Sequence, residues 1–204
     1  FDKLKDKGYL ASDQLLLFVS SGGTDNANSP TPELEDAGCA KVKNYVKLLF
    51  DDGKGNRQIF GIIDWDYKRS DSERVLVFGN KTRYSIENFI YDPLFIAFYA
   101  LLEAKEKSRF GFDEKDDFHI INTLTPDKLQ SIIDAITPGI YRKMTWKDGD
   151  VKDVSKMPVN LINGMTVQMP KWFLFCQGHR VEKACRAEFG MLNADKIRVF
   201  IKRV

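Results

Sequence analysis

The chain has 204 residues, of which 43% are hydrophobic and 29% are charged, and this balance predicts one globular domain or one domain with an appended subdomain. Its formal net charge of +2 is too small to indicate a nucleic-acid or membrane partner, so any basic surface must be local. The three cysteines lack CxxC spacing and are accompanied by only two histidines, which argues against a disulfide framework and a zinc site. The sequence shows no signal peptide or membrane span, so we expect a cytoplasmic protein.

The first half of the chain has the pattern of a parallel sheet. Residues 15–19 (LLLFV) form a continuous apolar run, which predicts a strand buried on both faces. After a long polar loop, residues 40–50 have apolar side chains at helical spacing and predict an amphipathic helix. Residues 59–63 and 74–78 predict two further strands. Because a strand, a helix and a strand in this order make a βαβ unit, we expect a parallel sheet of at least three strands.

The next segment predicts a core helix that is broken at Asp92-Pro93. The residues expected to face the core are Ile86, Phe89, Ile90, Leu94, Phe95, Phe98, Leu101 and Leu102. The run at residues 103–117 mixes both charge signs and predicts a solvated helix end and loop. His119, in the apolar stretch FHII, is expected to be a core residue.

The last third of the chain predicts two more helical segments. Residues 125–137 predict a helix with Thr125 as N-cap and Pro126 at its first position. The residues expected to face inward are Leu129, Ile132, Ile133 and Ile136. Residues 170–192 predict an apolar segment, a turn at Gly178 and a closing helix. The expected buried face of that closing helix is Val181, Cys185, Phe189 and Leu192. The cysteines are expected to fill space in the core.

Two carboxylates end the strand predicted at residues 59–63. Asp64 and Asp66 are two residues apart, so on an extended strand their side chains point the same way and repel each other. A divalent cation is one source of compensation, and a turn with nearby lysine and arginine is another. Ligands of open parallel sheets bind beyond the carboxyl ends of the strands, which favours a magnesium or manganese site. The alternative is structural, because both residues also suit an Asx turn or a helix cap.

Glu87 is a third acid of interest because it interrupts an otherwise apolar helical face. Burying an unpaired carboxylate costs free energy, so Glu87 needs a partner. The metal site is one candidate. The other is an ion pair with Arg83 or Lys81, of which Arg83 lies four residues earlier on the same predicted helix.

These stretches resemble the Toprim domain of the OLD (overcoming lysogenization defect) family nucleases and related bacterial proteins. The resemblance is carried by LLFVSSGG with the helix KVKNYVKLL, by GIIDWDY and by RYSIENFIYDP, and it covers residues 1–104. Beyond them, GHRVEKA is similar to the turn and helix that close the family's domain. The resemblance implies an α/β, Toprim-like fold with a mainly parallel sheet flanked by helices and a less regular C-terminal portion. We expect a core at residues 1–110 and a closing portion of the same domain at 111–204.

The resemblance also implies a divalent-metal-dependent nuclease that hydrolyses DNA phosphodiester bonds, often in bacterial anti-phage defence. Asp64 and Asp66 match the family's metal ligands and Glu87 matches its later acid, with Mg²⁺ or Mn²⁺ as the cofactor. The family's first strand, which ends in a glutamate, is not found here, and FDKLKDKG is similar to the end of the following helix. Either the strand precedes Phe1 in a longer protein, or this chain does not bind metal as the family does. No G-x-x-x-x-G-K-[ST] motif is present, so an ATPase partner would be another segment or chain.

Basic residues near these acids and near the C-terminus are candidates for nucleic-acid contact: Lys68, Arg69, His179, Arg180, Arg198 and Lys202. From residue 180 onward, seven basic residues accompany three acids, which fits either a strip facing DNA or a solvated face. His179 is either a phosphate contact or an ordinary surface histidine. Two other functions therefore stay open: a non-catalytic module that binds nucleic acid or a partner ATPase subunit, and a phosphatase or phosphotransferase acting on small substrates.

Overall fold

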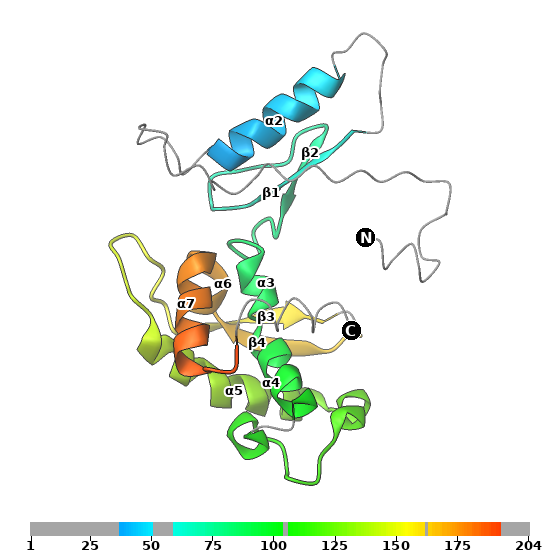
Figure 1. The fold of residues 1–204 in the computed structure, drawn as a ribbon, viewed down its shortest axis with the longest axis vertical. Coiled ribbons are helices and arrows are strands. Elements are labelled where there is room, and N and C mark those ends of the chain that lie inside the picture. The colour runs from blue at the N-terminus through cyan, green and yellow to red at the C-terminus, as the bar shows by residue number, and fades with distance from the viewer. Residues whose placement is uncertain (1–36, 51–58, 104–105, 162, 193–204) are drawn as a thin grey trace. The chain divides into compact units, whose positions relative to one another are not determined.

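The chain forms a mixed α/β protein with two small sheets, one parallel and one antiparallel (Figure 1). The structure is a computed structural model, and it describes residues 37–50, 59–103, 106–161 and 163–192. The chain divides into two compact units: Phe1–Ile63 with Ser70–Val77, and Asp64–Arg69 with Phe78–Val204. The boundary expected at residue 110 falls inside the second unit.

The first unit packs a helix against a parallel pair of strands. Helix α2 spans Ala37–Phe50, and strands β1 and β2 span Gly61–Asp64 and Val75–Phe78. A Cβ atom at Gly61 would lie 2.7 Å from a methyl carbon of Val42, so glycine allows β1 to approach α2 closely. The predicted helix, both predicted strands and their parallel direction are confirmed. The strand predicted at residues 15–19 lies outside the described residues.

The coarse prediction of an α/β fold is therefore confirmed, but the expectation of a Toprim-like fold with a mainly parallel sheet is not. Within the described residues the strands divide equally between a parallel and an antiparallel pair, so the sheet content is not mainly parallel there. No helix in the described part of the chain has the length and apolar character needed to cross a bilayer.

The second unit begins with two helices, α3 at Glu87–Ile90 and α4 at Pro93–Leu102. The predicted break between them is confirmed, because the Asp92 side chain caps α4 by accepting from the Leu94 N–H at 2.9 Å. The predicted inward face is only partly right. Leu94 and Leu101 are buried, whereas Phe95 and Leu102 are 42% and 39% exposed, as is the preceding Ile86 at 46%. All ten residues of α4 are apolar, so the helix has no polar face, and its sequence does not show which face is buried.

The charged stretch after α4 contributes more to the core than expected. It contains one 3-10 helix, η1 at Lys107–Phe110, and a second, η2 at Phe118–Thr123, follows it. Phe110 and Phe112 are buried within the main apolar cluster, so the prediction of a solvated segment is wrong for them. His119 is exposed rather than buried, because its backbone belongs to a turn that Asp117 caps at the surface.

Helix α5, Pro126–Lys143, is the longest described helix and begins at the predicted cap, where Thr125 Oγ1 accepts from the Lys128 N–H. All four residues expected to face inward are buried: Leu129, Ile132, Ile133 and Ile136. The helix continues past residue 137 and through Pro138. Proline removes one backbone hydrogen bond there, but the fully buried Ile140 lies beyond it, and packing of α5 against α4 and α7 outweighs that loss.

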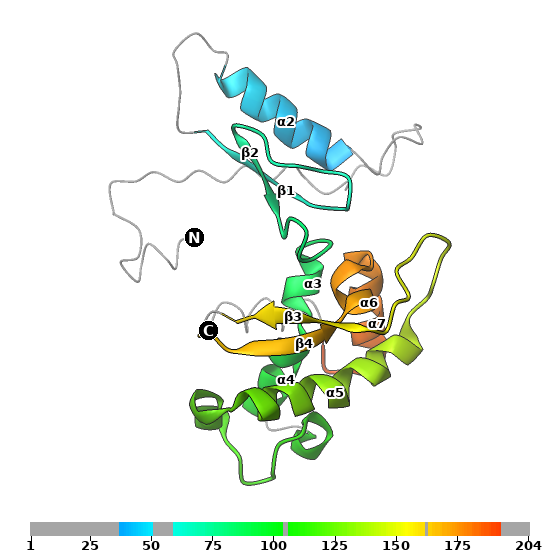
Figure 2. The same ribbon diagram turned by 180° about the vertical axis from the view of Figure 1, so that it is seen from behind.

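An antiparallel ribbon that the sequence did not predict lies beside α5 (Figure 2). Strand β3, Lys156–Asn160, pairs with β4, Thr166–Pro170. The Gln130 side chain on α5 holds the β4 edge, because its Nε2 donates to the Gln168 carbonyl at 3.0 Å and its Oε1 accepts from the Gln168 N–H at 2.6 Å. Each strand contains a proline, which is a signal against a strand interior.

Two helices complete the second unit, α6 at Lys171–Phe175 and α7 at Gly178–Glu188. The predicted buried face of the closing helix is confirmed at all four positions: Val181, Cys185, Phe189 and Leu192. Cys176 and Cys185 are buried free thiols, as expected for cysteines that fill space. α7 also packs against α3, which brings the two helix starts together.

Candidate active site

Asp64 is the last residue of β1, and its side chain reaches the start of α3. Its Oδ1 accepts a hydrogen bond from the Ile86 N–H at 3.0 Å, across 22 positions of sequence. A carboxylate that receives a backbone N–H at a helix start also fits the capping role left open by the sequence. This contact holds the Asp64 carboxyl beside Glu87, the first residue of α3 in the same unit.

Asp66 does not continue the strand, which corrects the expectation of two parallel carboxylates on extended backbone. Strand β1 ends at Asp64, and Asp66 has a left-handed backbone with φ of 46°. The Asp66 N–H donates to the Tyr84 carbonyl at 3.0 Å, and its carboxylate forms an ion pair with Arg69. Arg69 also donates to the main-chain oxygen of Asp64 at 3.2 Å. Arg69 therefore offsets the charge repulsion between Asp64 and Asp66, which is one of the two means that the sequence allowed.

Glu87 is held from two sides. Its Oε2 accepts from the Ser85 hydroxyl at 2.5 Å, and its Oε1 lies 3.5 Å from Nδ1 of His179. Arg83, one of the two predicted partners of Glu87, pairs instead with Asp92 at 2.5 Å and stacks on the Phe89 ring. A serine and a histidine thus take the place expected for arginine.

The electrostatics of the site disfavour the charge on Asp64. Burial of the carboxyl is the largest cause that raises its pKa, and the negative charge of Glu87 is the next. Asp66 raises this pKa further, whereas the Ile86 N–H and Arg69 lower it. Glu87, rather than Asp66, is therefore the main electrostatic neighbour of Asp64.

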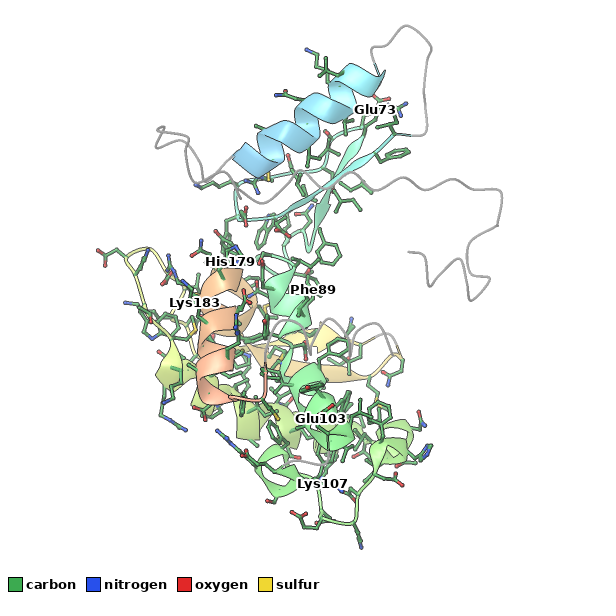
Figure 3. All side chains as sticks on the ribbon, viewed as in Figure 1. Glu73, Phe89, Glu103, Lys107, His179 and Lys183 are labelled. Atoms are coloured by element: carbon green, nitrogen blue, oxygen red, sulfur yellow. The ribbon has the colours of Figure 1, made fainter. Side chains whose placement is uncertain are left out.

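Gly178 allows α7 to approach Glu87. A Cβ atom at this position would lie 2.0 Å from Ser85 Oγ and 2.9 Å from Glu87 Cβ, so only glycine fits without moving one of the helices. His179 follows at the exposed start of α7 (Figure 3). Its Nδ1 is also 3.5 Å from Oε2 of Glu182, one helical turn further along.

Ser85, Glu182 and Tyr91, whose hydroxyl donates to Glu182 at 3.0 Å, were not predicted as neighbours of this site. Only Glu182 had a signal in the sequence, because it lies three residues after His179 on a helix.

Some of the candidate nucleic-acid contacts are exposed, and others already form ion pairs within the protein. Lys68 and His179 are exposed, whereas Arg69 pairs with Asp66 and Arg180 pairs with Asp150. The two remaining candidates, Arg198 and Lys202, lie outside the described residues.

The acids fit a divalent cation in part. Asp64 and Glu87 are two carboxyls close enough for one to raise the pKa of the other, and Mg²⁺ typically takes one or two carboxylates. Asp66 fits less well, since Arg69 already neutralises it. Among the described residues, no group of three histidine, cysteine or acidic side chains is arranged to hold a metal ion.

Comparisons with protein-family models, with curated proteins and with solved structures found no match for this chain. What is established is a mixed α/β protein in which the partly buried acids Asp64 and Glu87 lie together in the second unit, at the starts of α3 and α7.

Proposed function

We propose that this chain is a Toprim-like, divalent-metal-dependent nuclease that hydrolyses DNA phosphodiester bonds in the bacterial cytoplasm, in an anti-phage system. Asp64 and Glu87 would hold the Mg²⁺ or Mn²⁺ ion, with Asp66 as the additional acid. One observation carries the proposal: the Ile86 N–H holds the Asp64 carboxyl beside Glu87 at the start of α3, where burial and the charge of Glu87 raise the pKa of Asp64. A cation bound between the two carboxyls would remove that electrostatic cost. The reaction class comes from the resemblance of GIIDWDY and RYSIENFIYDP to the OLD-family Toprim domain.

Each side chain has a role that its contacts support. A bound divalent ion supplies charge neutralisation at the phosphate and activation of water. The hydrogen bond from Ile86 orients the Asp64 carboxyl, and the Ser85 hydroxyl orients that of Glu87. His179 is exposed beside Glu87 and can donate a hydrogen bond to a phosphate oxygen. An ATPase, if one takes part, would be a partner outside this chain.

The test is cleavage of supercoiled and linear DNA by the full-length protein with Mg²⁺ or Mn²⁺. Asp64→Asn and Glu87→Gln keep side-chain shape and should lose cleavage, by roughly 100-fold or more if the ligands are essential. Glu103→Gln is the matched control, because Glu103 is exposed at the end of α4, far from His179 in the same unit (Figure 3). It should cleave like the wild type. Cleavage that survives in both site variants would remove the acids from the mechanism.

The alternative is a non-catalytic module that binds nucleic acid or a partner ATPase subunit. A specific observation favours it, because the ion pairs Asp66–Arg69 and Arg180–Asp150 satisfy these side chains without a metal. The two functions separate in a titration with Mn²⁺ followed by calorimetry. Heat of binding that disappears in Asp64→Asn supports the nuclease, whereas absence of binding together with retained DNA affinity supports the module.

A further inference from the structure

A cluster of four aromatic rings lies directly beside the candidate acids. It consists of Trp65, Tyr67, Tyr84 and Phe175. The ring of Tyr67 is central, with centroid distances of 4.4 Å to Trp65, 5.8 Å to Tyr84 and 5.7 Å to Phe175. Trp65 and Phe175 also meet edge to face at 6.0 Å. Three rings thus contact Tyr67.

Tyr67 is supported in this way but is not covered. The residue is 46% exposed, whereas Trp65, Tyr84 and Phe175 are each more buried. A large aromatic side chain that is braced by other rings and open to solvent has a fixed surface available for a ligand.

The backbone that presents this ring is strained. Asp66 and Tyr67 are consecutive residues with φ of 46° and 59°, a left-handed conformation that is uncommon for residues other than glycine and a clear outlier for a bulky one. Such strain costs free energy and tends to occur at functional sites. Here it directs the Tyr67 ring outward at the residue next to Asp66.

The chemistry around the ring selects the ligand. Exposed Lys68 follows Tyr67 immediately and can meet a phosphate, and the ring itself carries no charge. A flat, uncharged ring next to a cation suits a nucleobase and its phosphate. Inside a duplex both faces of each base are already stacked on neighbours, so an unpaired base or a base at a duplex end is what can stack on such a ring.

We propose that Tyr67, braced by Trp65, Tyr84 and Phe175, is a stacking platform for an unpaired base of single-stranded DNA, and that it directs the enzyme to single strands or frayed ends. This inference rests on the proposed function for its choice of a nucleic acid. It goes further by naming the form of the substrate and the residue that recognises it.

The test measures binding of the full chain to a short fluorescent oligothymidylate by anisotropy, in EDTA so that no cleavage occurs. Tyr67→Phe keeps the ring and should bind like the wild type. Tyr67→Ala should weaken binding roughly 5- to 100-fold, the range expected for loss of one base–aromatic stack. An oligonucleotide with abasic positions should bind the wild type about as weakly as the intact one binds Tyr67→Ala, and duplex DNA should show little dependence on residue 67.

A second variant separates recognition from folding. Tyr67→Gly removes the ring, and glycine accepts the left-handed backbone without strain. Phe95→Ala is the matched control, since Phe95 is 42% exposed on α4 in the same unit. Loss of single-strand binding in Tyr67→Gly, with a melting temperature near that of the wild type and full binding by Phe95→Ala, supports the platform. Retained binding in both Tyr67→Ala and Tyr67→Gly, or equal affinity for abasic and intact strands, would overturn it.

The outcome does not depend on catalysis. If the wild type binds single strands through Tyr67 but never cleaves DNA with Mg²⁺ or Mn²⁺, the platform stands and the nuclease fails. If it cleaves DNA and Tyr67→Ala binds and cleaves single strands like the wild type, the nuclease stands and the platform fails.

Discussion

Replacing Asn88 with alanine tests the contact that holds α3 against α6 and the turn that follows α6. Asn88 is fully buried, and its Nδ2 donates to the carbonyl oxygens of Phe173 at 2.7 Å and Cys176 at 3.1 Å. Its Oδ1 accepts from the Ser85 N–H at 3.1 Å. Alanine would leave three buried backbone groups without these partners, next to the residues that orient Glu87.

The expected loss of stability follows from these three groups. A buried polar group that loses its partner costs about 1–3 kcal/mol, with carbonyls at the lower end because they keep a second lone pair. We therefore expect Asn88→Ala to lower the free energy of unfolding by about 3–5 kcal/mol. Asn88→Asp keeps the shape but replaces the amide donor by a carboxylate facing two carbonyl oxygens, so it should be at least as destabilising at neutral pH.

The assay is urea unfolding followed by tryptophan fluorescence. All three tryptophans, Trp65, Trp146 and Trp172, belong to the second unit, so the signal reports on the unit that contains Asn88. With a urea dependence of about 1–3 kcal/mol per molar, the midpoint should fall by about 2 M. Asn163→Ala, at an exposed turn where its Oδ1 accepts from the Met165 N–H, should change stability by less than about 1 kcal/mol. An equally small effect of Asn88→Ala would refute the idea that this amide holds α3 in place.

Asp64→Asn should make the protein more stable than the wild type at neutral pH without metal, because a raised pKa in the folded state means that ionisation of Asp64 opposes folding. The difference should shrink as the pH falls and vanish below the ordinary aspartate pKa of 3.8, which urea unfolding across this range checks. Gly178→Ala should destabilise by about 1–3 kcal/mol because its Cβ would overlap Glu87, whereas at Gly190 an added Cβ meets nothing within 4 Å and alanine should be tolerated. Equal melting temperatures of the two alanine variants would contradict the close approach. Thr125→Ala should cost about 1 kcal/mol by removing the cap of α5, and Thr125→Ser should restore it in the same melt.

The parts of the fold that sequence reasoning predicted are those with local signals. The Asp92-Pro93 break and the Thr125 cap depend on side chains within three residues of the backbone groups that they bind. The β3–β4 ribbon was missed because its prolines argue against strands, and its stability comes from α5, through Gln130. Phe110 and Phe112 were missed because most of their neighbours in sequence are charged, and such a segment is expected to be solvated.

The candidate site was predictable in its residue types but not in its geometry. Asp64 and Glu87 were singled out because carboxylates interrupt apolar runs. The left-handed backbone at Asp66 and Tyr67 could not be predicted, since aspartate is uncommon in this conformation even though it is enriched there, and a bulky tyrosine disfavours it. The contact with His179 depends on α7 packing against α3, across more than ninety positions of sequence, and only Gly178 hinted at a close approach.

The site combines features that cost free energy of folding with a buried hydrogen-bond network that stabilises the surrounding structure. The raised pKa of Asp64 and the left-handed residues Asp66 and Tyr67 each cost free energy, whereas buried Asn88 fixes α3 beside them. If these features served only the fold, relieving them by Asp64→Asn or Tyr67→Gly would have no reason to affect ligands. If they serve the proposed chemistry, the same changes should leave the fold intact and remove metal binding in one case and single-strand binding in the other. A strained, electrostatically unfavourable turn beside a well-satisfied buried network is the arrangement expected of a functional site, because only a rigid frame can maintain it.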